Sequence, residues 1–213
     1  MERNITMVNP SETPYSYALF LTLSNSRFCK SVVWQAGELQ AQGSTPINWD
    51  DDQTEINLGT IKKETIEIKS NWPATCGNSY TLTTVKDKIN AQTGPGDKRN
   101  PEAIIVSNKT GKKLDIGVSP DKNAALFMES ILSNEKVLFE MPPQYHLCIL
   151  EGTAKIEKGT IVKDPRCESS SVPIEGTLAM TDIKLDNDHS MAMITLSVNT
   201  KGLSLIVSYP GSI

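Results

Sequence analysis

Short runs of β-branched, aromatic and aliphatic residues recur along the whole chain, and Gly, Pro, Asn or Asp interrupts nearly every run. In residues 15–23, apolar side chains occupy both odd and even positions, which indicates a strand covered on both faces. Residues 54–58 and 191–198 alternate apolar and polar side chains, as half-exposed strands do. Because such runs recur about every 8–12 residues, the pattern is typical of an all-β sandwich.

The sequence therefore predicts an all-β fold, an antiparallel β-sandwich of about a dozen short strands with at most one short helix. Residues 122–132 favour a helix, with Asp121 as its N-cap, and a strand is an equal alternative there. Residues 91–101 contain several Gly and Pro residues and are expected to form a loop, which offers a seam between two halves. With 213 residues, we expect a single domain over residues 1–213.

Charge and composition argue against several classes of partner. The net charge is −4, and Lys and Arg do not cluster with aromatic residues, so we expect no nucleic acid partner. No apolar run approaches the ~18 residues of a membrane-spanning helix, so we expect no membrane span. The first residues lack the apolar segment of a signal peptide. The location stays open between the cytoplasm and secretion or surface display by an unconventional route.

The first 152 residues carry a series of packing and turn motifs. The early ones are Met7-Val-Asn-Pro-Ser11, the strand with Phe20, Ser31-Val-Val-Trp34, and Gly-Ser before Trp49-Asp50. The later ones are Gly117-Val-Ser-Pro120, Val137-Leu-Phe-Glu-Met141, Pro143-Gln-Tyr-His146 and Gly152. Together they resemble the RhiA-like family of small bacterial and fungal β-proteins over about two-thirds of the chain. The resemblance implies a β-sandwich fold, transfers no catalytic residue, and does not extend beyond Gly152.

No group of residues in the sequence indicates an active site. The two histidines are His146, in an apolar strand, and His189, in an acidic turn, and no Gly-x-Ser-x-Gly motif is present. His146 and Cys148 are two residues apart, so they share one face of a strand and are the only evident Cys–His pair. The sequence predicts a protein that is not an enzyme.

Two acidic turns are candidate calcium sites, because calcium binds hard oxygen ligands from neighbouring turn residues. Ordinary turn chemistry is the alternative, since Asp side chains mimic backbone turns. The candidate metal ligands are Asp50, Asp51, Asp52, Asp182, Asp186 and Asp188.

Two further sets of residues are candidates for binding or cross-linking. Trp72, expected in a loop, is a candidate ligand-binding aromatic residue. Cys76 and Cys167 lie beside turn residues and are candidates for a disulfide within or between chains, whereas Cys148 is expected in the core.

These observations favour a non-catalytic, secreted or surface-associated binding protein that resembles an adhesin or a lectin module. A carrier of a small apolar molecule or pigment is the alternative, and an enzyme of unknown class is third. Residues 203–209 are apolar, β-prone and uncharged, so we expect a homo-oligomer, most simply a dimer. The expected core includes Phe20, Trp34, Leu138 and Ile149.

Overall fold

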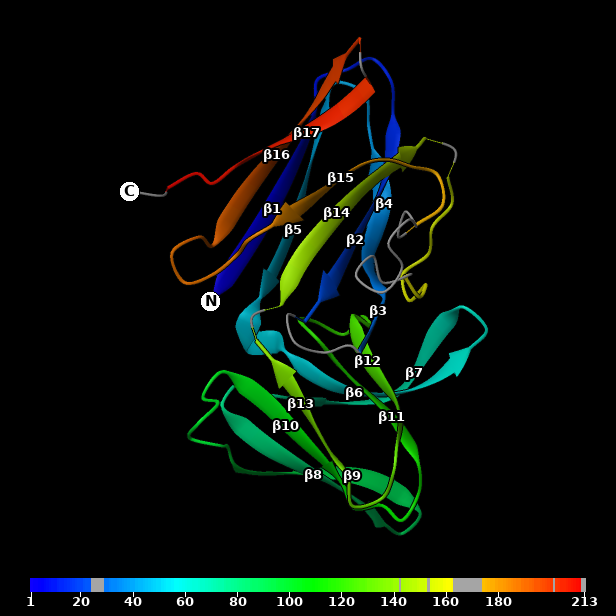
Figure 1. The fold of residues 1–213 in the computed structure, drawn as a ribbon, viewed down its shortest axis with the longest axis vertical. Coiled ribbons are helices and arrows are strands. Elements are labelled where there is room, and N and C mark those ends of the chain that lie inside the picture. Colours follow the sequence, from blue (N-terminus) through cyan, green and yellow to red (C-terminus); the bar gives the residue numbers. More distant parts are fainter. Residues whose placement is uncertain (24–28, 142, 153, 163–173, 201, 212–213) are drawn as a thin grey trace.

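The computed structural model describes residues 1–23, 29–141, 143–152, 154–162, 174–200 and 202–211 (Figure 1). Within these residues the chain forms 17 β-strands in four sheets, and its one helical element is the 3-10 turn η1 (Asp51–Gln53). This confirms the all-β prediction. In the same part of the chain, no helix has the length and apolar character needed to cross a membrane.

Sheets I and II, each of four strands, form the upper half of Figure 1. Sheet I contains, in spatial order, β17 (Gly202–Ser208), β16 (Met191–Asn199), β1 (Glu2–Asn9) and β5 (Gly43–Asp50). Sheet II contains β15 (Thr177–Ile183), β14 (Gln144–Glu151), β2 (Tyr15–Thr22) and β4 (Val33–Leu39).

The other two sheets form the lower half (Figure 1). Sheet III contains β3 (Cys29–Ser31), β12 (Leu126–Ile131), β11 (Leu114–Ser119), β6 (Glu55–Lys62) and β7 (Thr65–Pro73). Sheet IV contains β13 (Lys136–Glu140), β10 (Ala103–Asn108), β8 (Asn78–Val85) and β9 (Lys88–Pro95). Pairing is antiparallel except between β1 and β16 and between β8 and β10.

The chain visits the upper half twice. It builds half of the strands of sheets I and II with β1, β2, β4 and β5, runs through β6 to β13 below, and returns with β14 to β17 (Figure 1). Apart from the short strand β3, which joins sheet III between β2 and β4, the lower half is thus inserted between β5 and β14. The number of domains stays a prediction.

Residues 126–131 form strand β12, one of the two alternatives for this segment, because Leu126 and Phe127 are buried against neighbouring strands in sheet III. Two other local expectations are corrected. Residues 91–95 belong to β9, which pairs with β8 across a tight turn, so the loop is shorter than expected. Leu138 is only partly buried, because alternation in β13 turns Val137 and Phe139 toward the core instead.

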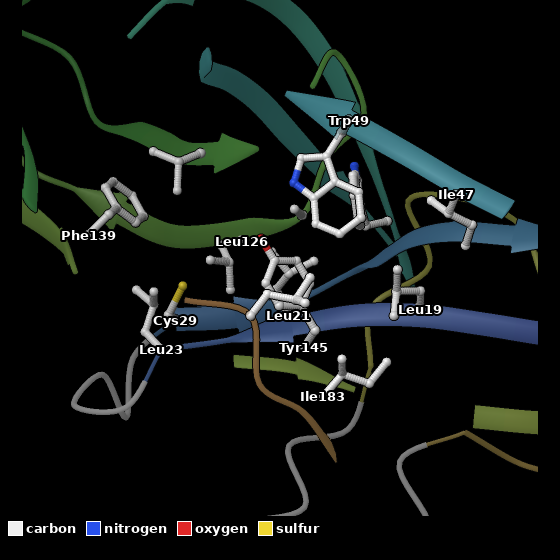
Figure 2. Packing of buried hydrophobic residues seen from close by; sticks show 14 of the residues in the cluster. Leu19, Leu21, Leu23, Cys29, Ile47, Trp49, Leu126, Phe139, Tyr145 and Ile183 are labelled. Atoms are coloured by element: carbon white, nitrogen blue, oxygen red, sulfur yellow. The ribbon is translucent and has the colours of Figure 1, made fainter. Parts of the chain in front are cut away.

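The core is one continuous hydrophobic cluster that runs through both halves (Figure 2). At its centre Trp34 and Trp49 meet edge to face with ring centroids 4.9 Å apart, and Tyr145 lies 5.3 Å from Trp49. Leu126 and Phe139 of the lower half belong to the same cluster. The predicted burial of Phe20, Trp34 and Ile149 is confirmed.

A partly buried carboxylate, that of Asp121, connects this cluster to sheet III. The Trp34 indole N–H donates to Asp121 Oδ1 at 2.8 Å, and the Gln35 amide donates to Asp121 Oδ2 at 3.1 Å. Asp121 also accepts from the backbone N–H of Asn123 at 2.8 Å. Asp121 therefore fixes the turn between β11 and β12 against strand β4, in place of its expected role as a helix cap.

Sheet II carries apolar side chains on its outer face as well. Phe20, Cys148 and Leu150 form a second cluster there, covered by Val162 and Ile174 from the segment after β14. Seven of the eight residues of β2 are buried, and β2 lies between β14 and β4. The sequence prediction of a strand covered on both faces is confirmed.

Truncation of Trp34 tests the junction between the halves. Trp34→Ala removes a fully buried ring, so it should lower the free energy of unfolding by about 3–5 kcal/mol. Asp121→Ala leaves the Trp34 N–H without its partner and should cost about 1–3 kcal/mol. Urea denaturation followed by Trp fluorescence measures both. Leu132→Ala, at an exposed site, is the control, and equal effects of all three would contradict this account.

Candidate functional site

A cavity of about 260 Å³ lies where the two halves meet. Its walls come from β1, η1, β14 and the segments that precede β8, β10 and β16. The residues that determine its chemistry are Arg3, Asp51, Glu102, Met141, Pro143 and Tyr145. The volume is near the lower end of small-molecule sites, so it fits a molecule with about one ring.

Arg3 forms the polar wall of the cavity. Its side chain is 4% exposed, and its Nε donates to Asp51 Oδ2 at 2.7 Å. Its Nη1 donates to the backbone carbonyl oxygens of Asp186 and His189. A buried guanidinium needs such partners, because an unpaired buried charge is costly. Arg3 thus binds β1 to η1 and to the turn before β16.

Acidic residues outnumber basic ones around the cavity. Asp51, Glu102 and Asp186 line it together with Arg3, the single basic residue among those that do. Cys76 is exposed as a residue, but partial desolvation of its thiol raises the pKa, and the nearby Asp51 and Glu102 carboxylates raise it further. Burial also raises the pKa of Tyr145, with Asp51 adding to the effect. Burial is the largest cause of both pKa shifts, and the Arg3 charge acts in the opposite direction on the pKa of Tyr145.

The turn between β15 and β16 supplies another wall of the cavity. Asp186 Oδ1 lies 2.9 Å from the His189 Nδ1 atom and accepts from the backbone N–H of Asp188 and His189. The contact with His189 holds the pKa of Asp186 at about 2, helped by these N–H groups and by Lys184. The turn is therefore organised around one ionised carboxylate.

The first acidic turn does not bring its carboxylates together. Asp50 accepts from the N-terminal ammonium of Met1 at 2.9 Å and caps η1, while Asp51 pairs with Arg3. Asp52 is 86% exposed and lies 3.5 Å from the Met1 ammonium. The three carboxylates serve charge pairing and turn formation.

The second acidic turn is also dispersed. Asp182 contacts His146 from β15, whereas Asp186 contacts His189 in the turn that follows. Across the described ranges, no group of three or more His, Cys, Asp or Glu side chains is placed to hold a metal ion. Calcium binding at either turn has no support in this geometry.

The remaining predicted site residues are also placed. Trp72 lies in strand β7 and not in a loop, and it is partly buried against the main core. Cys76 is exposed and lines the junction cavity, and it forms no disulfide within the described residues. Cys167 lies outside the described residues, so the disulfide stays a prediction. Cys148 is buried, as expected.

Sheet II contains a polar chain that the sequence did not reveal. His146 Nε2 lies 2.8 Å from Thr22 Oγ1, and His146 Nδ1 lies 2.7 Å from Asp182 Oδ1. The imidazole also stacks on Phe20 with ring centroids 4.9 Å apart. A hydroxyl, an imidazole and a carboxylate in this order resemble a hydrolytic triad. However, Thr22 is 1% exposed, so a substrate cannot reach its hydroxyl. The polar chain instead connects the side chains of the three neighbouring strands β2, β14 and β15.

The strand register explains why the sequence alone does not reveal the polar chain formed by Thr22, His146 and Asp182. His146 stands opposite Phe20 on one side and Asp182 on the other, and Thr22 is the diagonal neighbour two residues along β2. These residues are far apart in sequence, and no local spacing reports a cross-strand contact.

Comparison with known proteins finds no matching family model, no matching curated protein and no matching solved structure. The resemblance to the RhiA-like family stays a prediction.

Loss of His146 tests the structural role of the polar chain. His146→Ala removes the stack on Phe20 and the partner of the buried Thr22 hydroxyl, so we expect a loss of about 2–4 kcal/mol in unfolding free energy. Asp182→Ala is the matched variant, and because its carboxylate is 59% exposed the cost should stay below about 1 kcal/mol. Chemical denaturation measures both, and a larger effect of Asp182→Ala would argue against a structural brace.

The Asp186 turn gives a pH dependence of known sign. Since the folded-state pKa is about 2, below the usual value of 3.8, the ionised form stabilises the fold above about pH 4. This contribution is lost as the pH falls from about 4 to 2. The melting temperature of Asp186→Asn should therefore fall less steeply in that range than that of the unaltered protein. Asp87→Asn, in the β8–β9 turn, is the control, and identical slopes for Asp186→Asn and the unaltered protein would refute the assignment.

Proposed function

We propose that this protein is a non-catalytic binding protein that holds a small molecule in the junction cavity between its two halves. The cavity itself carries the proposal, because it is concave, mostly apolar and contains a few converging polar groups, as ligand sites do. Met141 and Pro143 supply apolar walls, and the Tyr145 ring supplies an aromatic one.

The charges favour a ligand with a positive group. The Asp51 carboxylate forms an ion pair with Arg3, but Glu102 forms no ion pair within the described part of the chain. Asp186 adds a second carboxylate at the wall. Tyr145 lines the cavity with an aromatic side chain, a group that attracts ammonium cations. The ligand class is therefore a small aromatic or apolar amine.

This proposal is closest to the alternative function that the sequence suggests, a carrier of a small apolar molecule. Adhesin- or lectin-like binding, secretion and a bound pigment stay predictions without further support. The proposal includes the absence of catalysis. Within the described residues it is supported by the burial of the Thr22 hydroxyl, which a substrate cannot reach. A homo-oligomer is also proposed.

Titration with phenethylammonium, an aromatic amine of suitable size, tests the site. Isothermal calorimetry or NMR chemical shifts should show saturable binding, and phenylacetate, the anion of similar shape, should bind at least about tenfold more weakly, a difference of about 1.4 kcal/mol. Glu102→Gln should reduce this preference, because it removes a carboxylate that has no ion pair in the described part of the chain.

Filling the cavity provides the matched control. Met141→Trp places a large ring in the cavity and should abolish binding, whereas Leu132→Trp, at an exposed site on the turn before β13, should leave it intact. Equal binding by both variants, or binding of neither the amine nor the anion to the unaltered protein, would reject the junction cavity as the site.

A further inference from the structure

The edges of the four sheets differ in how they are protected. Natural edge strands avoid unwanted pairing by carrying charged residues, Pro or bulges. In the described part of the chain, seven of the eight edge strands contain at least one charged residue, and β17 contains none. The charged edge residues are Asp50 in β5, Asp182 in β15, Glu38 in β4, Lys30 in β3, Glu67 and Lys69 in β7, Lys136 and Glu140 in β13, and Lys88 in β9.

β17 has the sequence Gly-Leu-Ser-Leu-Ile-Val-Ser and contains no Pro. It pairs with β16 over all seven residues without a register shift, so it is a regular strand with no bulge. Its other edge joins no strand within the described residues. Strand β15 lies beside it but is paired in sheet II. Within the described residues, the backbone donors and acceptors of this edge are thus protected by no charge, Pro or bulge of β17 itself.

The outer face next to this edge is also free of charge. Ile206 is 57% exposed, and its neighbours across β16 and β1 on that face are Thr195 and Val8. Met191 and Met193, both exposed, continue the face along β16. Charged residues of sheet I appear on this face only at its far end, at Glu2 and Asp50. In a chain with 22% charged residues, such a face is unusual.

We propose that β17 pairs antiparallel with β17 of a second copy, so that two copies of sheet I form one eight-stranded sheet across a two-fold axis. Antiparallel pairing of a strand with itself is self-complementary and closes as a dimer. Each copy has a net charge of −4, so two copies repel unless they meet at an uncharged surface. The β17 edge is the sheet edge that meets this requirement, and it is separate from the junction cavity.

The size of the contact predicts its strength. Seven residues at about 3.4 Å each give an edge of about 24 Å, and two packed sheets are about 10 Å apart. The contact area at this edge is thus about 240 Å² per partner, well below the ~800 Å² that each partner buries in a standard interface. We therefore expect a weak dimer that dissociates on dilution.

Light scattering on the full chain, over a concentration series from about 1 to 500 μM, tests the proposal across the range in which a weak dimer forms. The average mass should rise from one copy toward two, with and without reductant. Hydrogen exchange at the high end should show protection of the β17 amides that point away from β16, and dilution should remove it.

A charge swap makes the test specific for self-pairing. Ile206→Lys and Ile206→Glu each put like charges close to the two-fold axis, so each variant alone should be monomeric. An equimolar mixture of the two should recover the dimer. Ser204→Lys is a second exposed position on the same strand, and Val85→Lys, an exposed apolar site in the lower half, should leave dimerisation unchanged.

The outcomes separate the alternatives. A monomer at every concentration rejects the proposal, as does a dimer that persists in Ile206→Lys. A dimer that is lost only with reductant identifies an inter-chain disulfide instead. A dimer without protection of the β17 amides points to pairing through the sheet face and also overturns edge pairing.

Discussion

The contact of Trp34 with Trp49, Tyr145 and Asp121 holds the rest of the structure in place. Trp34 is fully buried, so its N–H requires an internal acceptor, and Asp121 of the lower half supplies it. The ring of Trp34 meets Trp49 edge to face, which is a favoured geometry for aromatic pairs. A single residue thereby joins the two sheets of the upper half to the β11–β12 turn below. Because the hydrophobic cluster continues through this point, the halves share one core (Figure 2).

The same junction generates the candidate site. The chain leaves the upper half after β5 and returns at β14, so the ends of several strands converge in one place. Aromatic packing fills the interior of this convergence, and beyond it the connecting segments leave a cavity beside Tyr145. Arg3 is buried there because Asp51 and two backbone carbonyls compensate its charge. The site is thus a consequence of inserting one pair of sheets into another.

Sequence patterns predicted the strands because the relevant information is local. Alternation and turn residues identified β6, β16 and β17, and the apolar residues on both sides of β2 predicted that both of its faces are covered. Residues 126–131 were ambiguous because a strand with Leu, Phe and Met at its start has the composition of a helix. Trp72 was expected in a loop, since Asn71 and Pro73 flank it, yet an edge strand such as β7 tolerates Pro at its end.

The candidate site was beyond prediction because its residues come together only through topology. Arg3 and Asp51 are 48 positions apart, and Arg3 and Asp186 are 183 apart. The contact of His146 with Thr22 depends on the register between β14 and β2, two strands that are far apart in the sequence. The acidic runs are candidate calcium sites in the sequence, with ordinary turn chemistry as the alternative. In the structure an ammonium, a guanidinium or an imidazole lies beside five of the six aspartates, Asp50, Asp51, Asp52, Asp182 and Asp186. Composition reports which groups are present, and topology decides which of them meet.

The two outer faces of the upper half show how the sequence distinguishes covered from open surface. On sheet II the outward residues Phe20, Cys148 and Leu150 are apolar, and the chain itself covers them with Val162 and Ile174. On sheet I the outward residues are mainly Ser, Thr, Asn and Met, and in the described residues no segment crosses them. A face meant only for water normally carries Lys, Glu, Arg or Asp, which also discourage association. On the outer face of sheet I, charged residues occur only at one end, at Glu2 and Asp50, so the composition of the rest of this face suits contact with another uncharged protein surface more than permanent exposure to solvent.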